Sequence, residues 1–388
     1  MTEGGTMTTR IFGRVVTPFG VIPDGLVVIE RDRISRVGHR TEKDVRNSDG
    51  VLDYRGSYIA PGFVDIHCHS GKTGRCYEDP HGFAEHHLDF GTTGILPTLD
   101  YNQSHEEILQ SLSDILVAME NPETSIIGVH MEGPYINPKY GAITSPIRPV
   151  SEKEYREILD RAGSTIKLWT LAPELDGQEE FMRAASRYGI VFSVGHSEAS
   201  PDTIFSAYRH GLKIGCHLTN ASGSTPEVAR FRGTREVGVH EAVLVHDDMY
   251  AEVIPDREGI HVRPLMLRLI VKAKGVEKVI IITDATGHAD NGEGRDVRIT
   301  DGNEHTPGGK KETLSGSLLT MNQAVRNMIA HTGVGIVDAA RMASLNPATA
   351  LGLDAEIGSI EPGKKANIVA LTDKIDVEMV MVNGRVRR

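Results

Sequence analysis

Two histidines stand two residues apart at the end of an apolar run, where their side chains can act together. The run covers residues 60–64 and continues into Asp65-Ile66-His67-Cys68-His69. If it forms a β-strand, its period of two places His67 and His69 on one face, within reach of a single cation. The pair alone is weak evidence for a metal site, because a polar pair at a strand end explains it equally well.

Four more polar residues follow apolar runs later in the chain, and each is a candidate for metal binding or proton transfer. They are Glu132, His196, His217 and Asp284. Imidazole and carboxylate groups are favoured by zinc and tolerated by other divalent first-row metals. We therefore expect a divalent metal, with zinc as the first choice and one or two ions per chain.

Asp284, which ends the last of these runs, is the candidate catalytic residue. A divalent metal lowers the pKa of bound water to roughly 7. A neighbouring carboxylate can then accept a proton and pass it to a leaving amine. The alternative is an aspartate that caps the following helix. For His130, two residues before Glu132, we expect a structural role.

The elements that must hold these side chains are short apolar runs separated by helical stretches. Runs that are apolar on both faces are typical of buried parallel strands. Eight occur, and they predict an α/β fold with a (β/α)8 barrel of the TIM type, in which the strand ends meet at one mouth. The runs end near His67, Thr98, His130, Thr170, Val194, His217, Ile254 and Thr283.

The two chain ends share a different pattern, in which short β-branched runs alternate with turns. We expect residues 1–59 to form a small antiparallel sheet and residues 355–388 to join it, with a hairpin at Asn383-Gly384. The two segments would make a small β-sandwich domain, and the barrel would span residues 60–354. The polar segment from His288 to Glu312 suggests an excursion or a hairpin.

Composition narrows the classes of binding partner that we expect for this chain. The chain of 388 residues has 42 basic and 53 acidic residues and a net charge of −11, and it has no run of Lys or Arg beyond what a solvated surface carries. A nucleic-acid partner is therefore not expected. No stretch of about 18 apolar residues predicts a membrane span. Three cysteines cannot all pair, and two neighbour histidines in predicted strands, which favours a reducing compartment, the cytoplasm. Partners should be small molecules or other subunits.

These motifs resemble those of the amidohydrolase superfamily, beginning with His-x-His after residues 61–65. Residues 130–138, His-Met-Glu-Gly-Pro-Tyr-Ile-Asn-Pro, are similar to the metal-binding Glu segment of N-acetylglucosamine-6-phosphate deacetylases. The similarity runs from about Pro61 to the end of the chain. Further matching segments are residues 170–174, 195–199, 217–221, 283–285, 314–317, 345–348 and 358–367.

The resemblance implies a role for each candidate. Glu132, His196 and His217 would bind the principal metal, while His67 and His69 would hold a second ion bridged through Glu132. Asp284 would be the general base and acid. The substrate would be an N-acetylated amino sugar 6-phosphate that loses acetate, and the chain would form a homodimer. Substrate-binding positions would be Ala142, Ile143, Asn220, Ala221, Arg235, His261, Leu314, Ser315 and Gly316, with Arg235 on the phosphate.

The chain departs from the family pattern where specificity would be set. Ile143 stands where the family usually places a histidine, and an apolar side chain cannot donate a hydrogen bond. The interval from His217 to Arg235 is longer than in the family, and Arg257-Glu258 opens an Asp-Gly-x-His element. Two alternatives therefore stay open: hydrolysis of another N-acyl amine or a cyclic amide, and a metal-loaded binding protein without turnover.

Overall fold

Eight parallel strands form the barrel in the computed structural model, which describes residues 8–46, 50–142, 147–223, 231–234, 236–287, 296–301 and 312–388. The segment after the last strand closes the ring, since Asp284 N donates to His67 O and His69 N donates to Ala285 O, both at 2.9 Å. The predicted barrel is confirmed. In chain order its strands are β5 (Phe63–Cys68), β6 (Thr92–Leu99), β7 (Val129–Glu132), β8 (Ile166–Leu171), β9 (Val191–Val194), β10 (Leu212–Gly215), β11 (Tyr250–Val253) and β12 (Val279–Ile281).

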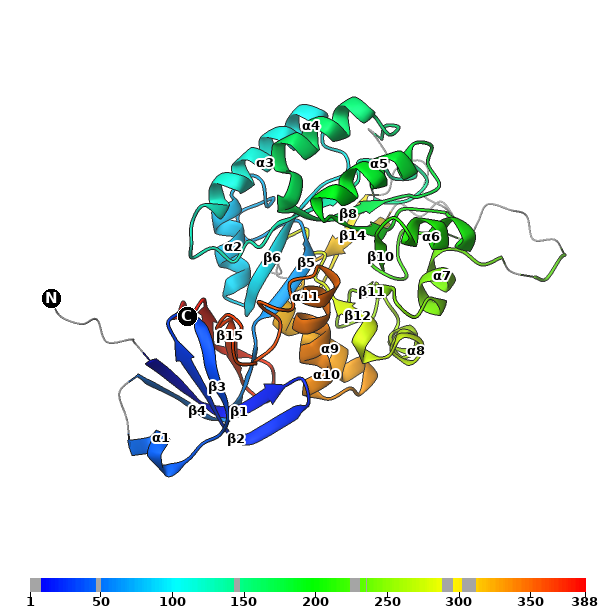
Figure 1. Ribbon diagram of the computed structural model, residues 1–388. Helices are drawn as coiled ribbons and strands as arrows, with labels where there is room; N and C mark the ends of the chain where they lie inside the picture. Colours follow the sequence, from blue (N-terminus) through cyan, green and yellow to red (C-terminus); the bar gives the residue numbers. More distant parts are fainter. Residues whose placement is uncertain are drawn as a thin grey trace.

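Helices surround the strands and bury them on their outer side (Figure 1). The strands are almost wholly buried, because the helices cover one face and the side chains of the barrel interior cover the other. Ser104 starts one helix with a capping box: its hydroxyl accepts from Glu107 N, and the Glu107 carboxylate accepts from Ser104 N. The helices are α2 (Pro80–Leu88), α3 (His105–Met119), α4 (Glu152–Ala162), α5 (Gln178–Ala185), α6 (Pro201–Tyr208), α7 (Val239–Val245), α8 (Pro264–Lys274) and α9 (Met321–Thr332).

Both chain ends meet in one seven-stranded sheet, in the order β17-β16-β15-β4-β1-β2-β3. The expectation of a purely antiparallel sheet is wrong for one pair, because β1 and β4 run parallel. A parallel pair needs a crossover connection, which the segment containing α1 (Glu42–Arg46) supplies. The strands are β1 (Thr8–Thr17), β2 (Gly20–Glu30), β3 (Arg33–His39), β4 (Val51–Pro61), β15 (Ile368–Leu371), β16 (Val377–Val382) and β17 (Arg385–Val386).

The boundary between the two parts lies between two consecutive strands, β4 of the terminal sheet and β5 of the barrel. β4 pairs with β15 through residues 58–61, and β5 begins at Phe63. The divisions at residues 59 and 60 and at 354 and 355 stay predictions. Between barrel and sheet lie α10 (Ile336–Ala340), a π-helical turn (Arg341–Leu345) and α11 (Asn346–Ala350), and short 3-10 turns cover Gly163–Thr165, Ser186–Tyr188 and Val276–Lys278.

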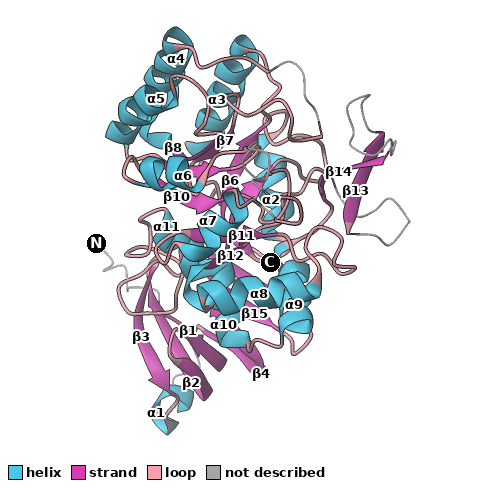
Figure 2. Ribbon diagram, turned by 90° about the vertical axis from the view of Figure 1, so that its right-hand side faces the viewer, coloured by secondary structure: helices cyan, strands magenta, loops and turns pink. Residues whose placement is uncertain are grey.

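The polar segment before α9 contains a hairpin, as predicted, made of β13 (Val297–Asp301) and β14 (Glu312–Ser317). Figure 2 shows it at the edge of the barrel domain, away from the terminal sheet. The last residues of β14 return to the barrel, where Ser317 N donates to Asp284 O at 2.8 Å. This return brings Ser315, near the end of β14, to the mouth of the barrel.

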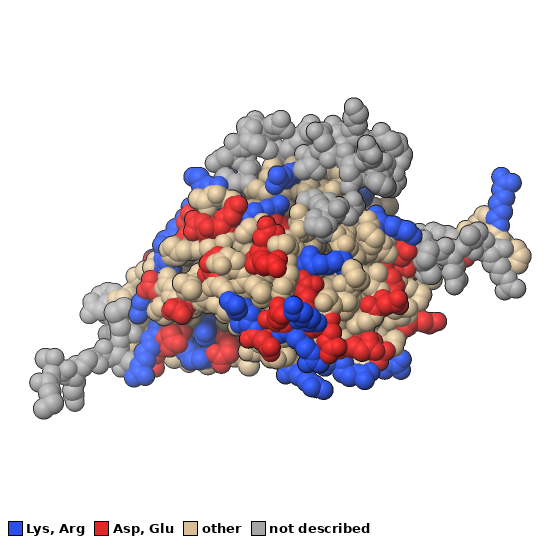
Figure 3. All heavy atoms as spheres, turned by 90° about the horizontal axis from the view of Figure 1, so that it is seen from above, with Lys and Arg blue, Asp and Glu red and all other residues tan. Residues whose placement is uncertain are grey.

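The surface carries both signs of charge. On the face drawn in Figure 3, basic and acidic side chains are interspersed. Among the helices described, none is both long and apolar enough to cross a membrane. Cys68, Cys76 and Cys216 are all buried and free.

Candidate active site at the carboxyl ends of the barrel strands

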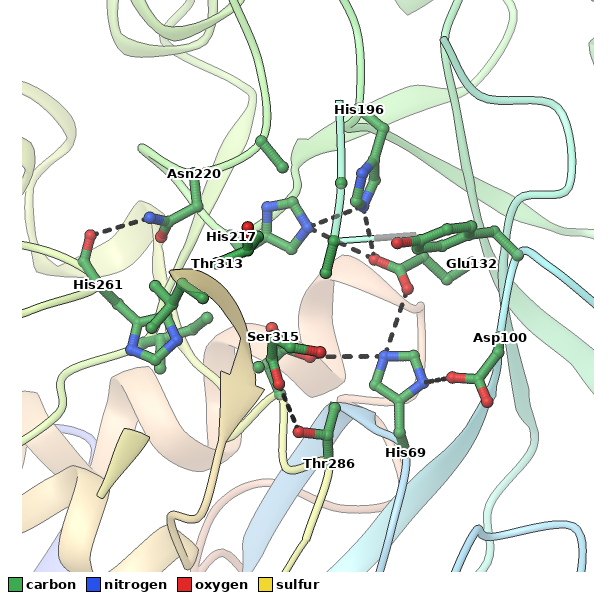
Figure 4. A pocket seen from close by; sticks show the side chains of 18 of the residues that line it. His69, Asp100, Glu132, His196, His217, Asn220, His261, Thr286, Thr313 and Ser315 are labelled. Carbon is green, nitrogen blue, oxygen red and sulfur yellow. Dashed lines mark hydrogen bonds and ion pairs between the residues drawn. The ribbon is translucent and has the colours of Figure 1, made fainter. Parts of the chain in front are cut away.

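A pocket of about 250 Å³ opens at the mouth of the barrel, where the carboxyl ends of the strands meet. Figure 4 shows His69 and Asp100 on one side of it, His196 and Glu132 above them, and Asn220 with His261 on the opposite side. The lining residues are His69, Arg75, Asp100, Tyr101, Asn102, Glu132, Gly141, Ala142, His196, His217, Asn220, Ala221, Ile254, His261, Asp284, Thr286, Thr313, Leu314, Ser315 and Gly316.

Three predicted ligands converge at the centre of the pocket. Glu132 ends β7, and its Oε1 lies 2.9 Å from His196 Nε2 and 3.4 Å from His217 Nε2. The two imidazole nitrogens are 3.1 Å apart. One donor atom from each residue lies within 4.8 Å of the others, which is a spacing that one metal ion can bridge.

The histidine pair of β5 lies on the other side of Glu132. His69 Nε2 is 3.3 Å from Glu132 Oε2, and His67 Nε2 is 3.5 Å from Glu132 Oε1. These three residues form a second group whose donor atoms lie within 4.8 Å of one another. The glutamate therefore lies close to all four histidines: its Oε1 faces His67, His196 and His217, and its Oε2 faces His69.

Backbone strain is concentrated in the same place. His196, His217 and Asp284 have φ values of 50°, 27° and 47°, and Ala221 beside them has 45°. Residues other than glycine seldom adopt this left-handed backbone conformation. Each instance costs conformational free energy, which contacts elsewhere in the fold must offset. His196, His217 and Asp284 come two or three residues after the ends of β9, β10 and β12, so the turn that follows each strand aims the side chain into the mouth.

Asp284 faces the histidine pair. Its Oδ1 lies 3.4 Å from His69 Nε2 and 3.6 Å from His67 Nε2. Burial by itself would raise the pKa of the Asp284 carboxyl, but the His67 and His69 rings outweigh burial and hold that pKa below its ordinary value. The carboxyl is therefore ionised at neutral pH and able to accept a proton.

His130 has the structural position expected for it. Its ring is fully buried between the hydroxyls of Thr98, at 3.1 Å from Nδ1, and Thr170, at 2.8 Å from Nε2. Burial and the neighbouring His67 keep the pKa of His130 well below its ordinary value. The neutral ring packs edge-on against His67, with ring centres 4.6 Å apart.

Seven of the residues predicted to bind substrate line the pocket. Asn220 Nδ2 donates to His261 O at 3.0 Å, and buried Asp256 accepts from His261 N at 2.8 Å. Ala142, Ala221, Leu314, Ser315 and Gly316 line the same pocket. Ile143 and Arg235 lie outside the described residues.

Two carboxylates of the site were missed by sequence reasoning. Asp100 follows β6 directly and lies 2.9 Å from His69 Nδ1, so its position at a strand end was an available signal. Glu252 lies within β11 and is fully buried beside His67, at 3.4 Å from Nδ1. An acidic residue inside an apolar strand is almost never fully buried without a partner, which was the signal for Glu252.

The donor set fits a bound metal. The buried His67 Nε2 points at Glu132 and Asp284, yet it has no hydrogen-bond partner among the described residues. Neutral imidazole nitrogens and carboxylate oxygens at this spacing are ligands for a divalent first-row ion. The residues that would hold it are Glu132, His196 and His217, with His67 and His69 as the second group.

Comparison with known proteins agrees with this geometry. The family model described as "Amidohydrolase family" matches residues 58–387. This range contains the whole barrel and every candidate site residue. The chain belongs to the amidohydrolase family.

Within that family, the chain is similar to deacetylases of amino sugar phosphates. The chain is 30% identical to N-acetylglucosamine-6-phosphate deacetylase from Bacillus subtilis, over 96% of this chain and 95% of that protein. It is 27% identical to N-acetylgalactosamine-6-phosphate deacetylase from Escherichia coli O157:H7, over 92% and 98%. The structure of N-acetylglucosamine-6-phosphate deacetylase from Pasteurella multocida superimposes with a TM-score of 0.84 at 28% identity, covering 98% of this chain and 99% of that one.

Proposed function

We propose that this protein is a metal-dependent deacetylase that removes acetate from an N-acetylated amino sugar 6-phosphate. The observation that carries the proposal is the convergence of four histidines on Glu132, with Asp284 3.4 Å from His69 Nε2. The full-length similarity to deacetylases of two amino sugar phosphates supports the substrate class and leaves both epimers as candidates. A variant of the related Mycobacterium smegmatis enzyme has been solved in complex with N-acetyl-D-glucosamine-6-phosphate.

Divalent metal in this donor set, with zinc as our first choice, would polarise the acyl oxygen and make water more acidic. Asp284 supplies the proton transfer. Its carboxylate accepts a proton from the attacking water as the new C–O bond forms. It then donates that proton to the nitrogen as the C–N bond breaks, which releases acetate and the free amine. Its ionised state at neutral pH suits the first of these steps.

The other walls of the pocket would orient the sugar. Asn220, Ala221 and His261 would contact the hydroxyls and the phosphate ester, and Ala142 lines the same pocket. Leu314, Ser315 and Gly316 would line the acyl end, because the return of β14 brings them beside Asp284. Ile143 and Arg235 keep the roles expected from the resemblance, contact with the sugar for Ile143 and pairing with the phosphate for Arg235.

A panel of N-acetylated sugars with and without 6-phosphate tests this proposal. A hydrogen bond to a charged group such as a phosphate contributes about 1.5–3 kcal/mol of net free energy. We therefore expect kcat/KM to rise about 10- to 100-fold when the 6-phosphate is present. Arg235→Ala should remove most of this gain, because a guanidinium fits phosphate oxygens bidentately. The matched control is Arg232→Ala, an exposed arginine nearby, which should keep the gain.

Two results of the panel would count against the proposal. Equal kcat/KM with and without phosphate would favour another N-acyl amine or a cyclic amide as substrate. Binding of the sugars without release of acetate would favour the metal-loaded binding protein.

We also propose a homodimer in the cytoplasm. Large apolar side chains are exposed along the stretch that contains Arg235, including Val245 (73% exposed), Leu265 (78%) and Leu269 (50%). Such a surface suits a subunit contact. The buried free thiols suit a reducing compartment.

The dimer is tested by Leu265→Glu, which places a charge within this apolar surface. We expect the variant to sediment as a monomer, because an unpaired charge is costly at the centre of an interface. Val117→Glu, at an exposed apolar position elsewhere on the barrel (66% exposed), should sediment like the wild type. A wild-type protein that sediments as a monomer would refute the homodimer.

A further inference from the structure

His67 and His69, the histidine pair of β5, differ from the other candidate ligand histidines in the surroundings of Nδ1, the ring nitrogen that faces away from Glu132. A carboxylate oxygen lies beside Nδ1 in both members of the pair: Glu252 Oε2 at 3.4 Å from His67, and Asp100 Oδ1 at 2.9 Å from His69 (Figure 4). Within the described part of the chain, no carboxylate oxygen lies within 4.0 Å of Nδ1 of His196 or of His217, whose contacts with Glu132 are through Nε2. The carboxylates of Glu252 and Asp100 therefore lie beside the histidine pair only.

Glu252 reaches His67 from inside the barrel. It lies on β11 with no exposed surface, and its Oε2 also lies 3.4 Å from the backbone nitrogen of His217. The Cys216 thiol is 3.7 Å from the same His67 nitrogen, but a thiol is a weak acceptor, so the carboxylate is the stronger partner.

The fold gains little from this buried carboxyl group. Glu252 Oε1 has no hydrogen-bond partner among the residues that the structure describes. A buried carboxylate with one oxygen unsatisfied costs free energy, and an uncharged side chain of the same shape would stabilise the fold at least as well. Stability alone does not account for an acid at this position, whereas its distance from His67 suggests a role in the site.

Asp100 is held from the other side by residues of the pocket wall. Tyr77 donates its hydroxyl to Asp100 Oδ2 at 3.1 Å, and Arg75 Nη1 lies 3.3 Å from Oδ1. These contacts fix the carboxylate at the end of β6, with Oδ1 toward His69. Asp100 and Arg75 both line the pocket, and their contact links the end of β6 to the segment that carries Arg75.

We propose that Glu252 and Asp100 are positioning residues that keep Nδ1 of His67 and His69 protonated, so that both Nε2 atoms are free to bind a second divalent cation beside Glu132. In metal sites, the group that accepts a hydrogen bond from one ring nitrogen of a histidine fixes the tautomer and makes the other nitrogen a better ligand. The inference rests on the proposed metal site and adds how its second position is built.

The test is a metal titration of Glu252→Gln and Asp100→Asn against the wild type. Each replacement keeps the shape, but an amide can donate as well as accept, so it no longer selects the ring with Nδ1 protonated. Metal-free protein is titrated with Zn²⁺ in competition with a chromophoric chelator. We expect two equivalents in the wild type, and in both variants a second equivalent weakened about 10- to 100-fold with the first unchanged.

A buried acid outside the site provides the matched control. Glu154→Gln removes a buried carboxylate that accepts from Arg148 and Tyr135, and it should keep both equivalents at wild-type affinity. In the metal-free state, Glu252→Gln should have an unfolding temperature equal to or above that of the wild type, because a buried carboxyl group with an unsatisfied oxygen is replaced by an uncharged amide.

Three results would overturn the inference. The first is wild-type affinity for both equivalents in the two variants, and the second is a wild type that binds one equivalent only. The third is a lower unfolding temperature of metal-free Glu252→Gln together with weakening of both equivalents, which would show a structural role. Metal binding is read out separately from acetate release, so this inference and the proposed deacetylation can fail independently.

Discussion

Asp284→Asn should lower kcat for acetate release by about 10²- to 10⁴-fold, the range that general acid–base groups contribute. Asparagine keeps the size and the hydrogen bonds of the strand end, but it cannot accept the proton from water or return it to the amine. Metal content should stay close to that of the wild type, because Glu132 and the four histidines are unchanged. The measurement is steady-state acetate release together with metal analysis of the same preparation.

Asp248→Asn is the control for this experiment. Asp248 is an exposed aspartate near the start of β11, at the end of the barrel opposite the pocket, and its replacement should leave kcat and metal content unchanged. Near wild-type turnover in Asp284→Asn would remove the proton-transfer role. A large loss of metal in that variant would instead make Asp284 a ligand.

Glu132→Gln should have the most severe effect, because Glu132 is the residue that both groups of histidines share. Its two oxygens lie 2.9 Å from His196 and 3.3 Å from His69, and an amide is a far weaker metal ligand than a carboxylate. We expect the loss of metal affinity to exceed the roughly 10- to 100-fold effect of changing an outer partner. Turnover should fall with it, and added Zn²⁺ should restore chelator-treated wild type but not the variant.

The comparison for Glu132 is Glu157→Gln, an acid on α4 that pairs with His105 away from the pocket. This variant should lose activity on chelation and recover it with Zn²⁺, as the wild type does. A Glu132→Gln protein with full metal content and wild-type kcat would contradict the site as we have built it.

The strand-end pattern made much of this protein predictable. Parallel strands in a barrel all deliver their carboxyl ends to one mouth, so polar residues that follow apolar runs must meet there. This reasoning identified Glu132, His196, His217 and Asp284 from their places in the chain, and the structure brings them together. The terminal sheet was predictable for a similar reason, since its turns and alternating strands are local signals.

Other features could not be read from local signals. The parallel pairing of β1 with β4 depends on which edge of the sheet remains open after β2 and β3 have formed, and no short segment encodes that choice. Ile143 and Arg235 lie outside the described residues, so what was inferred for them rests on sequence similarity alone.

The amino-acid sequence by itself determined the barrel and the types of the candidate metal ligands, because periodicity and strand-end chemistry are local properties. Its motifs indicated the family through their resemblance to known members. Only the tertiary structure decided which ring nitrogens face Glu132 and which face Glu252 and Asp100. Glu252 lies 185 positions from His67 along the chain, and their contact exists because β11 and β5 enclose the same barrel interior. Side-chain rotamers in such an interior are set by packing from all sides, which sequence spacing does not specify.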